Sequence, residues 1–230
     1  MTKKLKLAIL FSGGKDSCLA LQYALKFADV KCLITLISEN PSSFMFHTPN
    51  IGLTKLQSEA IGIPIIQFTT QGEKELELQD LKEAIQKAID RYKIQGIITG
   101  AIESVYQASR IQKICQELDI ECFNPLWQKN QFELLEELVK EKFEAIITGV
   151  FAEGLDEFIG REISEKFIQD IRKMHDKYQI HVAGEGGEME SLVLDAPFFK
   201  KKLHPQIFHV EQDKEHGKVL IIDKIEIREK

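Results

Sequence analysis

The chain has 230 residues and a net charge of −6, with 43% hydrophobic and 29% charged residues. This balance is ordinary for a soluble globular protein, and the length allows one large domain or two small ones. No apolar run is long enough to span a membrane, and the negative charge disfavours a broad nucleic-acid-binding surface. The four cysteines form no CxxC pair, so we expect neither disulfides nor a metal cluster, and we expect a cytoplasmic protein.

Apolar runs and helical patterns alternate along the first two-thirds of the chain. Runs rich in Ile, Leu or Val predict strands buried on both faces at residues 5–11, 31–38, 63–68, 96–100 and 145–149. Apolar residues spaced by three and four predict helices within residues 78–92, 134–139 and 163–178. This alternation predicts an α/β fold with parallel strands and right-handed crossovers.

The pattern changes after about residue 180, and this change predicts a second domain. A loop rich in Gly and Glu is followed by strand-like runs at residues 191–194, 207–210 and 218–228, with no helical pattern between them. We therefore expect a smaller α+β domain after the parallel sheet. Asn124-Pro125 breaks the earlier pattern, so the predicted domains are residues 1–123 and 124–230. Residues 96–101 and 145–150 read alike, which predicts similar strand-to-loop geometry at both places.

The stretch Ser-Gly-Gly-Lys-Asp-Ser, residues 12–17, comes between the first predicted strand and a helix. Ligands of parallel sheets bind beyond the carboxyl ends of the strands. Gly13 and Gly14 let the backbone approach a ligand closely, and the amides of the helix's first turn attract phosphate. Ser12 and Ser17 add hydroxyl groups, and Lys15 adds a cation. The stretch therefore predicts a phosphate-binding loop.

Asp16 has two interpretations, as the N-cap of the helix or as a ligand of Mg²⁺ beside the phosphates. The alternative for the whole stretch is a turn with capping residues that binds nothing. Its position after the first strand favours phosphate binding. The stretch matches neither the Walker A pattern GxxxxGK[ST] nor GxGxxG. The pattern SGGxDS instead resembles the pyrophosphate loop (PP-loop) of the ATP pyrophosphatases, which cut ATP between the α and β phosphates.

Further motifs narrow the resemblance to one family. They lie, in order, at residues 44–50, 100–110, 125–127, 154–161 and 184–191. In this order they resemble the diphthine–ammonia ligase family over nearly the whole chain. The last motif, Gly-Glu-Gly-Gly-Glu, is the most specific, because other ATP pyrophosphatases lack it. Met189 departs from the family, which usually has an aromatic residue at that position.

The resemblance implies a PP-loop domain of the Rossmann-like (HUP) kind and an ATP-dependent reaction. Diphthine is a modified histidine on translation elongation factor 2, and the ligase would join ammonia to its carboxylate. An acyl-adenylate would form, and AMP and pyrophosphate would leave, with Mg²⁺ as cofactor. We see no glutaminase segment, so free ammonia is the expected nitrogen source. The expected partner is therefore the elongation factor; we expect no nucleic acid and no membrane partner, and a homo-oligomer stays open.

Residues outside the loop are also candidates for ATP. The full predicted ATP-binding set is Ser12, Gly13, Gly14, Lys15, Asp16, Ser17, Ser38, His47, Gly100 and Ala101. His47 sits in a loop with two phenylalanines, where packing explains it as well as nucleotide binding does. Tyr106, Gln107 and Arg110 share one helix face, and Arg110 suits a bidentate clamp on phosphate or carboxylate. The alternative for Arg110 is a surface salt bridge.

The acidic motif brings Glu185, Glu188 and Glu190 within six residues, with Gly186 and Gly187 between them. Such a run is usually a solvated turn. Here the apolar residues 192–194 follow directly, which places the carboxylates at the mouth of a buried strand. They suit the trimethylammonium group and imidazole of diphthine, with Met189 as a soft wall. Metal binding or base action stays open. We assign this motif, with Tyr106, Gln107 and Arg110, to substrate binding.

The predicted catalytic residues are Lys15, Asp16 and Glu188, with Asp16 as the metal ligand. Two other classes of protein compete with this prediction. A tRNA-modifying or small-molecule ligase with the same loop would want a paired cysteine or a basic extra domain, and the sequence has neither. A regulator that senses ATP without turnover would need only part of the motif set. Formation of AMP and pyrophosphate separates these classes.

Overall fold

The computed structural model describes residues 4–40, 50–73, 76–212 and 217–230. Its larger sheet is parallel and five-stranded, in the order β3-β2-β1-β4-β5. The strands are β1 (Lys6–Leu10), β2 (Asp29–Ser38), β3 (Ile65–Thr70), β4 (Gly96–Ile98) and β5 (Glu121–Phe123). The predicted parallel α/β class is confirmed. The pattern had shown the first four strands, and the three-residue β5 was missed.

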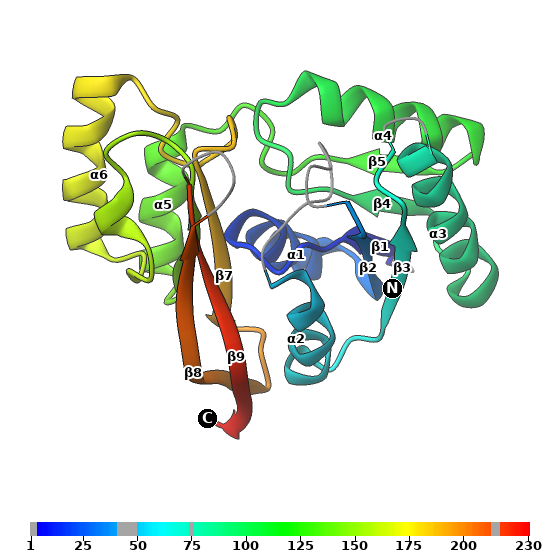
Figure 1. Ribbon diagram of the computed structural model, residues 1–230. Helices are drawn as coiled ribbons and strands as arrows, with labels where there is room; N and C mark the ends of the chain where they lie inside the picture. The colour runs from blue at the N-terminus through cyan, green and yellow to red at the C-terminus, as the bar shows by residue number, and fades with distance from the viewer. Residues whose placement is uncertain (1–3, 41–49, 74–75, 213–216) are drawn as a thin grey trace.

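Helices cover both faces of this sheet (Figure 1). They are α1 (Lys15–Phe27), α2 (Thr54–Ile61), α3 (Leu76–Tyr92) and α4 (Val105–Glu117), with the short 3₁₀ turn η1 (Ile51–Leu53) before α2. Leu7 and Ile9 of β1 pack in the core with α1, whereas Ala8 between them packs in the core with α3 and α4. Alternate side chains thus point to opposite buried faces, which is why these strands read as continuous apolar runs.

The second sheet is four-stranded, in the order β7-β6-β9-β8, and its pairs are antiparallel. Its strands are β6 (Glu144–Val150), β7 (Met189–Asp195), β8 (Lys201–Gln212) and β9 (Lys218–Glu229). The expectation that residues 145–149 pair in parallel was wrong. This segment is β6, and β7 and β9 lie antiparallel on either side of it. It alternates with helices along the chain, but its neighbours in space come from the C-terminal strands.

Helices α5 (Gln131–Lys140) and α6 (Glu165–Tyr178) pack beside the second sheet, and the 3₁₀ turn η2 (Asp156–Phe158) lies in the β6–α6 connection. Residues 163–178 and 134–139 were predicted as helices, as found. Because β6 belongs to the second sheet, its likeness in sequence to β4 reflects shared burial and not one shared sheet. No helix among the described residues is long and apolar enough to cross a membrane.

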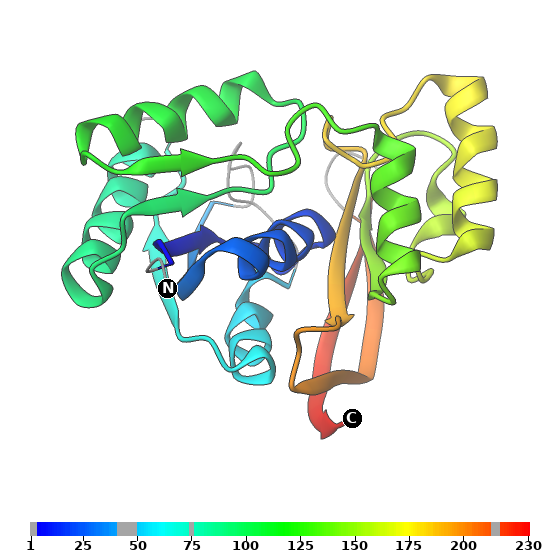
Figure 2. The same cartoon turned by 180° about the vertical axis from the view of Figure 1, so that it is seen from behind.

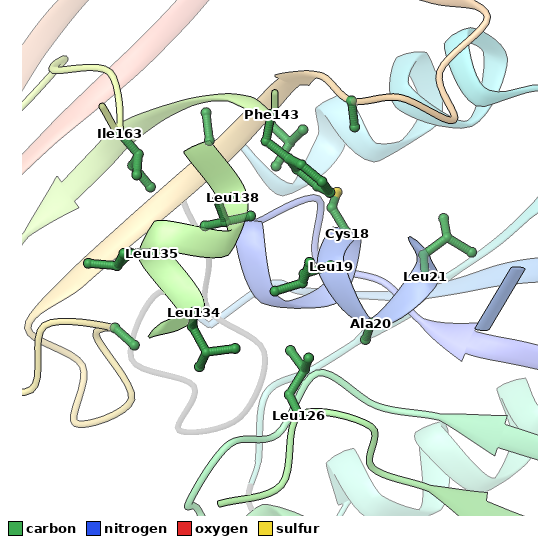
Figure 3. Packing of buried hydrophobic residues seen from close by; sticks show 14 of the residues in the cluster. Cys18, Leu19, Ala20, Leu21, Leu126, Leu134, Leu135, Leu138, Phe143 and Ile163 are labelled. Carbon is green, nitrogen blue, oxygen red and sulfur yellow. The ribbon is translucent and has the colours of Figure 1, made fainter. Parts of the chain in front are cut away.

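Helix α1 lies between the two sheets (Figure 2). One side of it packs on β1 and β4, and its N-terminal end reaches β7. Figure 3 shows Leu19 of α1 facing Leu134 and Leu138 of α5, with Leu126 close by. These side chains are at most 1% exposed, and one continuous apolar core joins them. The two sheets are therefore held against each other through α1, and the loop that precedes α1 lies at their junction.

Candidate functional site

A cavity of about 650 Å³ opens at this junction. One wall is the carboxyl edge of the parallel sheet, with Phe11 and Ser12 after β1 and Thr99 and Gly100 after β4. The facing wall is the loop 183–187 and the first residues of β7. β1 lies where the strand order reverses direction, which is where doubly wound sheets bind ligands. The volume is in the range of pockets for cofactor-sized molecules.

The backbone of the loop 12–17 takes a left-handed conformation at position 13, which favours glycine. Gly13 has φ of +78°, and its carbonyl oxygen accepts hydrogen bonds from the Val193 amide at 3.0 Å and from Gln57 Nε2 at 2.9 Å. A Cβ atom on Gly13 would lie 2.0 Å from Gln57 Oε1. Gly13 is not among the residues that line the cavity. It shapes the loop from behind, and the loop is fixed to both α2 and β7.

Gly14 is the N-cap of α1, so the interpretation of Asp16 as the N-cap was wrong. Asp16 lies one position inside the helix, in its first turn. The Ser12 and Ser17 hydroxyls lie 3.2 Å apart, and Ser17 donates to the Gly14 carbonyl. The N-terminus of α1 therefore lies at the cavity wall, where the positive end of its dipole attracts anions.

Lys15 and Asp16 form an ion pair at the cavity wall, in which Lys15 is buried and Asp16 is partly exposed. Lys15 Nζ lies 2.7 Å from Asp16 Oδ2 and also donates to the Ala183 carbonyl, while the Lys15 amide donates to Ser191 Oγ at 3.1 Å. Lys15 is 6% exposed. Burial raises the pKa of Asp16 above the ordinary aspartate value, and the adjacent Lys15 cation opposes that rise. The carboxylate is therefore costly to keep charged unless a cation compensates it.

These residues fit a magnesium nucleotide. Mg²⁺ is usually bound by one or two carboxylates together with substrate phosphates and water, and Asp16 supplies such a carboxylate beside the helix N-terminus. The described residues contain no cluster of three or more acidic, His or Cys side chains arranged to hold a metal ion alone. Asp16 would therefore hold Mg²⁺ together with the phosphate oxygens of a bound nucleotide.

Gly100 brings the end of β4 against the first turn of α1. A Cβ atom there would lie 2.9 Å from both the Asp16 carbonyl carbon and the Ser17 amide nitrogen. Ala101 follows, and its amide donates to Thr99 Oγ1 at 3.2 Å. Both predicted residues line the cavity.

Replacing Gly100 by alanine should therefore weaken ATP binding, because the added methyl group must push the backbone of α1 away. We expect the KM for ATP to rise about tenfold or more, since small displacements of a binding loop are costly. Gly52→Ala is the matched control, because a Cβ atom on Gly52 meets nothing within 4 Å. Equal KM values for the two variants in a steady-state assay would contradict this role of Gly100.

Glu185 connects the acidic loop to the parallel sheet. Its Oε1 atom accepts hydrogen bonds from the backbone amides of residues 102, 103 and 104, at 3.1, 3.0 and 2.9 Å. Ser104 is the N-cap of α4, and its hydroxyl accepts from the Gln107 amide. The carboxylate thus sits at the positive end of α4. Glu185 lines the cavity, but its carboxylate is already hydrogen-bonded to the β4–α4 loop.

His181 and Glu188 hold the acidic loop from behind. The Glu185 amide lies 3.3 Å from His181 Nδ1, and the His181 amide donates to Glu188 Oε1 at 2.9 Å. His181 Nε2 lies 3.5 Å from Glu103 Oε2, which adds a second link to the β4–α4 loop. Glu188 does not line the cavity, and its Oε2 atom is buried. This placement does not support the prediction that Glu188 is a catalytic residue, because its carboxylate is turned toward the backbone of residue 181.

The rest of the predicted set divides into two groups. Tyr106, Gln107, Gly186, Gly187 and Glu190 line the cavity, as does Met189. Ser38 and Arg110 do not: the Ser38 hydroxyl bonds to Asn40, and the Arg110 guanidinium stacks 3.4 Å from the centre of the Tyr106 ring. This placement of Arg110 does not support the predicted phosphate clamp. His47 lies outside the described residues.

Among the residues of the site that were missed from the sequence, three are polar and hold its loops in place or line its wall. Gln57 is fully buried in α2 and donates to both Gly13 and Val193. Ser191 and Ser104 line the cavity, and Ser191 holds the Lys15 amide across 176 positions of the chain. A glutamine on the buried face of an amphipathic helix is a signal that could have revealed Gln57. The position of Ser191 depends on the antiparallel pairing of β7, which no local pattern encodes.

The parallel sheet and the SGGKDS loop after its first strand place the chain among nucleotide-binding α/β proteins of the PP-loop class. Residues 5–122 match the family described as "Diphthamide synthase N-terminal domain", and residues 130–227 match "Diphthamide synthase C-terminal domain". The chain therefore belongs to the diphthamide synthase family.

Curated relatives support this assignment. The rat and human proteins named diphthine–ammonia ligase are 33% and 32% identical to the chain, over 86% of it and 82% of each relative. A solved Methanocaldococcus jannaschii structure, described as a predicted subunit of tRNA methyltransferase, aligns with a TM-score of 0.46 and 18% identity over 84% of this chain and 98% of that one. That likeness is too distant to bear on function. The relatives are named as ligases, and this chain is an enzyme of their family.

Proposed function

We propose that the protein is a diphthine–ammonia ligase that uses ATP to amidate the carboxylate of diphthine on translation elongation factor 2. One observation carries the proposal: the SGGKDS loop and the family's acidic motif, about 170 positions apart in the sequence, line a single cavity. The first suits a nucleotide, and the second lies where a cationic substrate group would approach it. Family membership supplies the reaction that joins these two functions.

The proposed chemistry has two displacements. A diphthine carboxylate oxygen attacks the α-phosphorus of ATP, and the bond to the bridging oxygen breaks, so that pyrophosphate leaves with the electron pair. The nitrogen of ammonia then attacks the acyl carbon, the carbon–oxygen bond breaks, and AMP leaves while the nitrogen loses a proton. The amides at the start of α1 and the Lys15 cation, prepositioned by Ser191 and Ala183, would stabilise the departing pyrophosphate.

The proposed setting is the cytoplasm, where translation elongation factors work. The elongation factor binds as a folded protein that presents its modified histidine to the cavity, so no nucleic acid takes part. Met189 is 6% exposed and lines the cavity, which gives the trimethylammonium group an apolar surface.

An omission assay tests the proposal. The protein should convert ATP to AMP and pyrophosphate only when diphthine-bearing elongation factor is present, and amide should accumulate only when ammonium is added. AMP formation with a tRNA in place of the factor would support another PP-loop ligase. Tight ATP binding with no turnover under any condition would support a regulator and contradict the proposal.

The nucleophile predicts the pH dependence of amidation. Ammonia attacks through its lone pair, and protonation to ammonium removes that pair. At a fixed, subsaturating total ammonium concentration, the rate should therefore rise with pH across the neutral range and level off once most of the nitrogen is unprotonated. Amide yield against pH measures this. A flat profile that persists when ammonium is lowered further would contradict direct attack by ammonia.

A further inference from the structure

A second, much smaller cavity adjoins the first. Its volume is about 10 Å³, counted as space for the centre of a water-sized molecule, which is the lower limit for holding one such molecule. Lys15, Ala183, Met189, Glu190 and Ser191 line both cavities. The small cavity therefore adjoins the proposed ATP site and shares these five residues with it.

The walls of the small cavity differ from those of the large one. Apart from the shared residues, they are all apolar: Leu135, Ile147, Ile163, Phe167 and Val182. Each is at most 3% exposed. Figure 3 shows Leu135 on α5 and Ile163 near each other at this end of the core. The cavity thus has an apolar interior and polar groups only on the side that faces the reaction.

Ammonia is the co-substrate that matches this environment. It has one heavy atom, like water, so it fits the volume. Apolar walls disfavour a charged ammonium ion far more than neutral ammonia. The polar side of the cavity offers neutral ammonia a hydrogen-bond donor, the Lys15 side chain, and an acceptor, the Glu190 carboxylate.

We infer that this small cavity is the binding site for ammonia, and that its apolar walls select ammonia against larger amines. The inference rests on the proposed function, because it assigns a place to the second substrate of that reaction. It goes beyond that function by naming the residues that set nucleophile size. None of the five apolar residues lines the larger cavity, so they act on the amine and not on ATP.

Two pairs of variants test the inference. Val182→Ile adds a methylene to the small cavity, and Val30→Ile makes the same change at a buried core position that lines neither cavity. Val182→Ile should raise the KM for ammonium roughly tenfold, the usual effect of one methylene in an apolar pocket, and leave the KM for ATP unchanged. Val30→Ile should change neither value.

Ile163→Ala enlarges the cavity, and Ile171→Ala removes the same atoms at a buried position outside it. The wild-type protein should discriminate strongly against methylamine. Ile163→Ala should reduce that discrimination about tenfold, as measured by competing methylamine against ammonium and weighing the two amides by mass spectrometry. If Val182→Ile does not fold, the comparison of Ile163→Ala with Ile171→Ala still tests the ammonia site.

The wild-type reaction with ammonium distinguishes failure of the proposed function from failure of the ammonia site. If the wild-type protein forms no amide, the proposed function fails and the small cavity has no ligand. If the wild-type protein forms amide but each cavity variant behaves like its matched control, the ammonia site is overturned and the proposed function stands. A shift in either cavity variant that its control lacks supports the ammonia site.

Discussion

Asp16→Asn should slow AMP formation about 10²–10³-fold and leave the protein at least as stable as before. The activity falls because asparagine has no charge to hold Mg²⁺ beside the pyrophosphate. Removing one preorganised electrostatic group of this kind typically costs about 10²–10³-fold in rate. Stability is kept because Gly14, and not Asp16, caps α1, so the substitution removes no cap.

The raised pKa of Asp16 sets the direction of the stability change. Burial favours the protonated form of this carboxyl in the folded protein, so at neutral pH its ionisation opposes folding relative to an exposed aspartate. Asparagine removes that opposition. We therefore expect the Tm of Asp16→Asn at neutral pH to equal or exceed the wild-type value, measured by thermal unfolding.

Asp29→Asn is the matched control for this experiment. Asp29 also pairs with a lysine, Lys31 at 2.6 Å, but it lies at the partly exposed start of β2. We expect this variant to have wild-type activity, because exposed ion pairs contribute little and Asp29 does not line the cavity. A folded Asp16→Asn protein that forms AMP at nearly the wild-type rate would contradict the metal-binding role.

Glu185→Ala should have the second large effect, on both stability and ATP affinity. The substitution removes one carboxylate oxygen that three backbone amides share. Hydrogen bonds to charged groups contribute about 1.5–3 kcal/mol, so we expect the free energy of unfolding to fall by about 3 kcal/mol. The KM for ATP should rise as well, because residues 100 and 101 of the cavity wall precede the released amides.

Two further variants separate the contribution of the Glu185 charge from that of its hydrogen bonds, and the role of Glu185 from that of Glu188. Glu185→Gln keeps an oxygen acceptor and loses only the charge at the α4 N-terminus, which costs about 0.3–1 kcal/mol. Glu188→Ala removes the acceptor of one amide, from His181, and should leave the KM for ATP nearly unchanged. Unfolding in urea and steady-state kinetics measure both quantities. If Glu185→Ala weakened only the engagement of the elongation factor, Glu185 would be a substrate contact and not a link between the two loops.

The sequence predicts the part of this site that local patterns encode. The loop 12–17 could be found because a strand, two glycines and a helix start are neighbours along the chain, and 13 of the 18 residues proposed as site residues line the cavity. The thirteen are Ser12, Gly14, Lys15, Asp16, Ser17, Gly100, Ala101, Tyr106, Gln107, Glu185, Gly186, Gly187 and Glu190.

The sequence could not predict features that depend on how the two sheets meet. The β6 strand looks like any strand of an alternating α/β pattern, and only pairing with β7 and β9 makes it antiparallel. Three nearby glutamates look equivalent in the sequence. Their different roles come from partners more than 80 positions away for Glu185 and from a neighbouring backbone amide for Glu188.

Transfer of oxygen from substrate to AMP tests the central claim most directly. If the diphthine carboxylate itself attacks the α-phosphorus, as proposed, one carboxylate oxygen must leave with AMP. With an elongation factor whose diphthine carboxylate is labelled with ¹⁸O, we predict that AMP carries one ¹⁸O atom for each amide formed, as read by mass spectrometry. Label in inorganic phosphate, or AMP without label while amide accumulates, would contradict activation by adenylation.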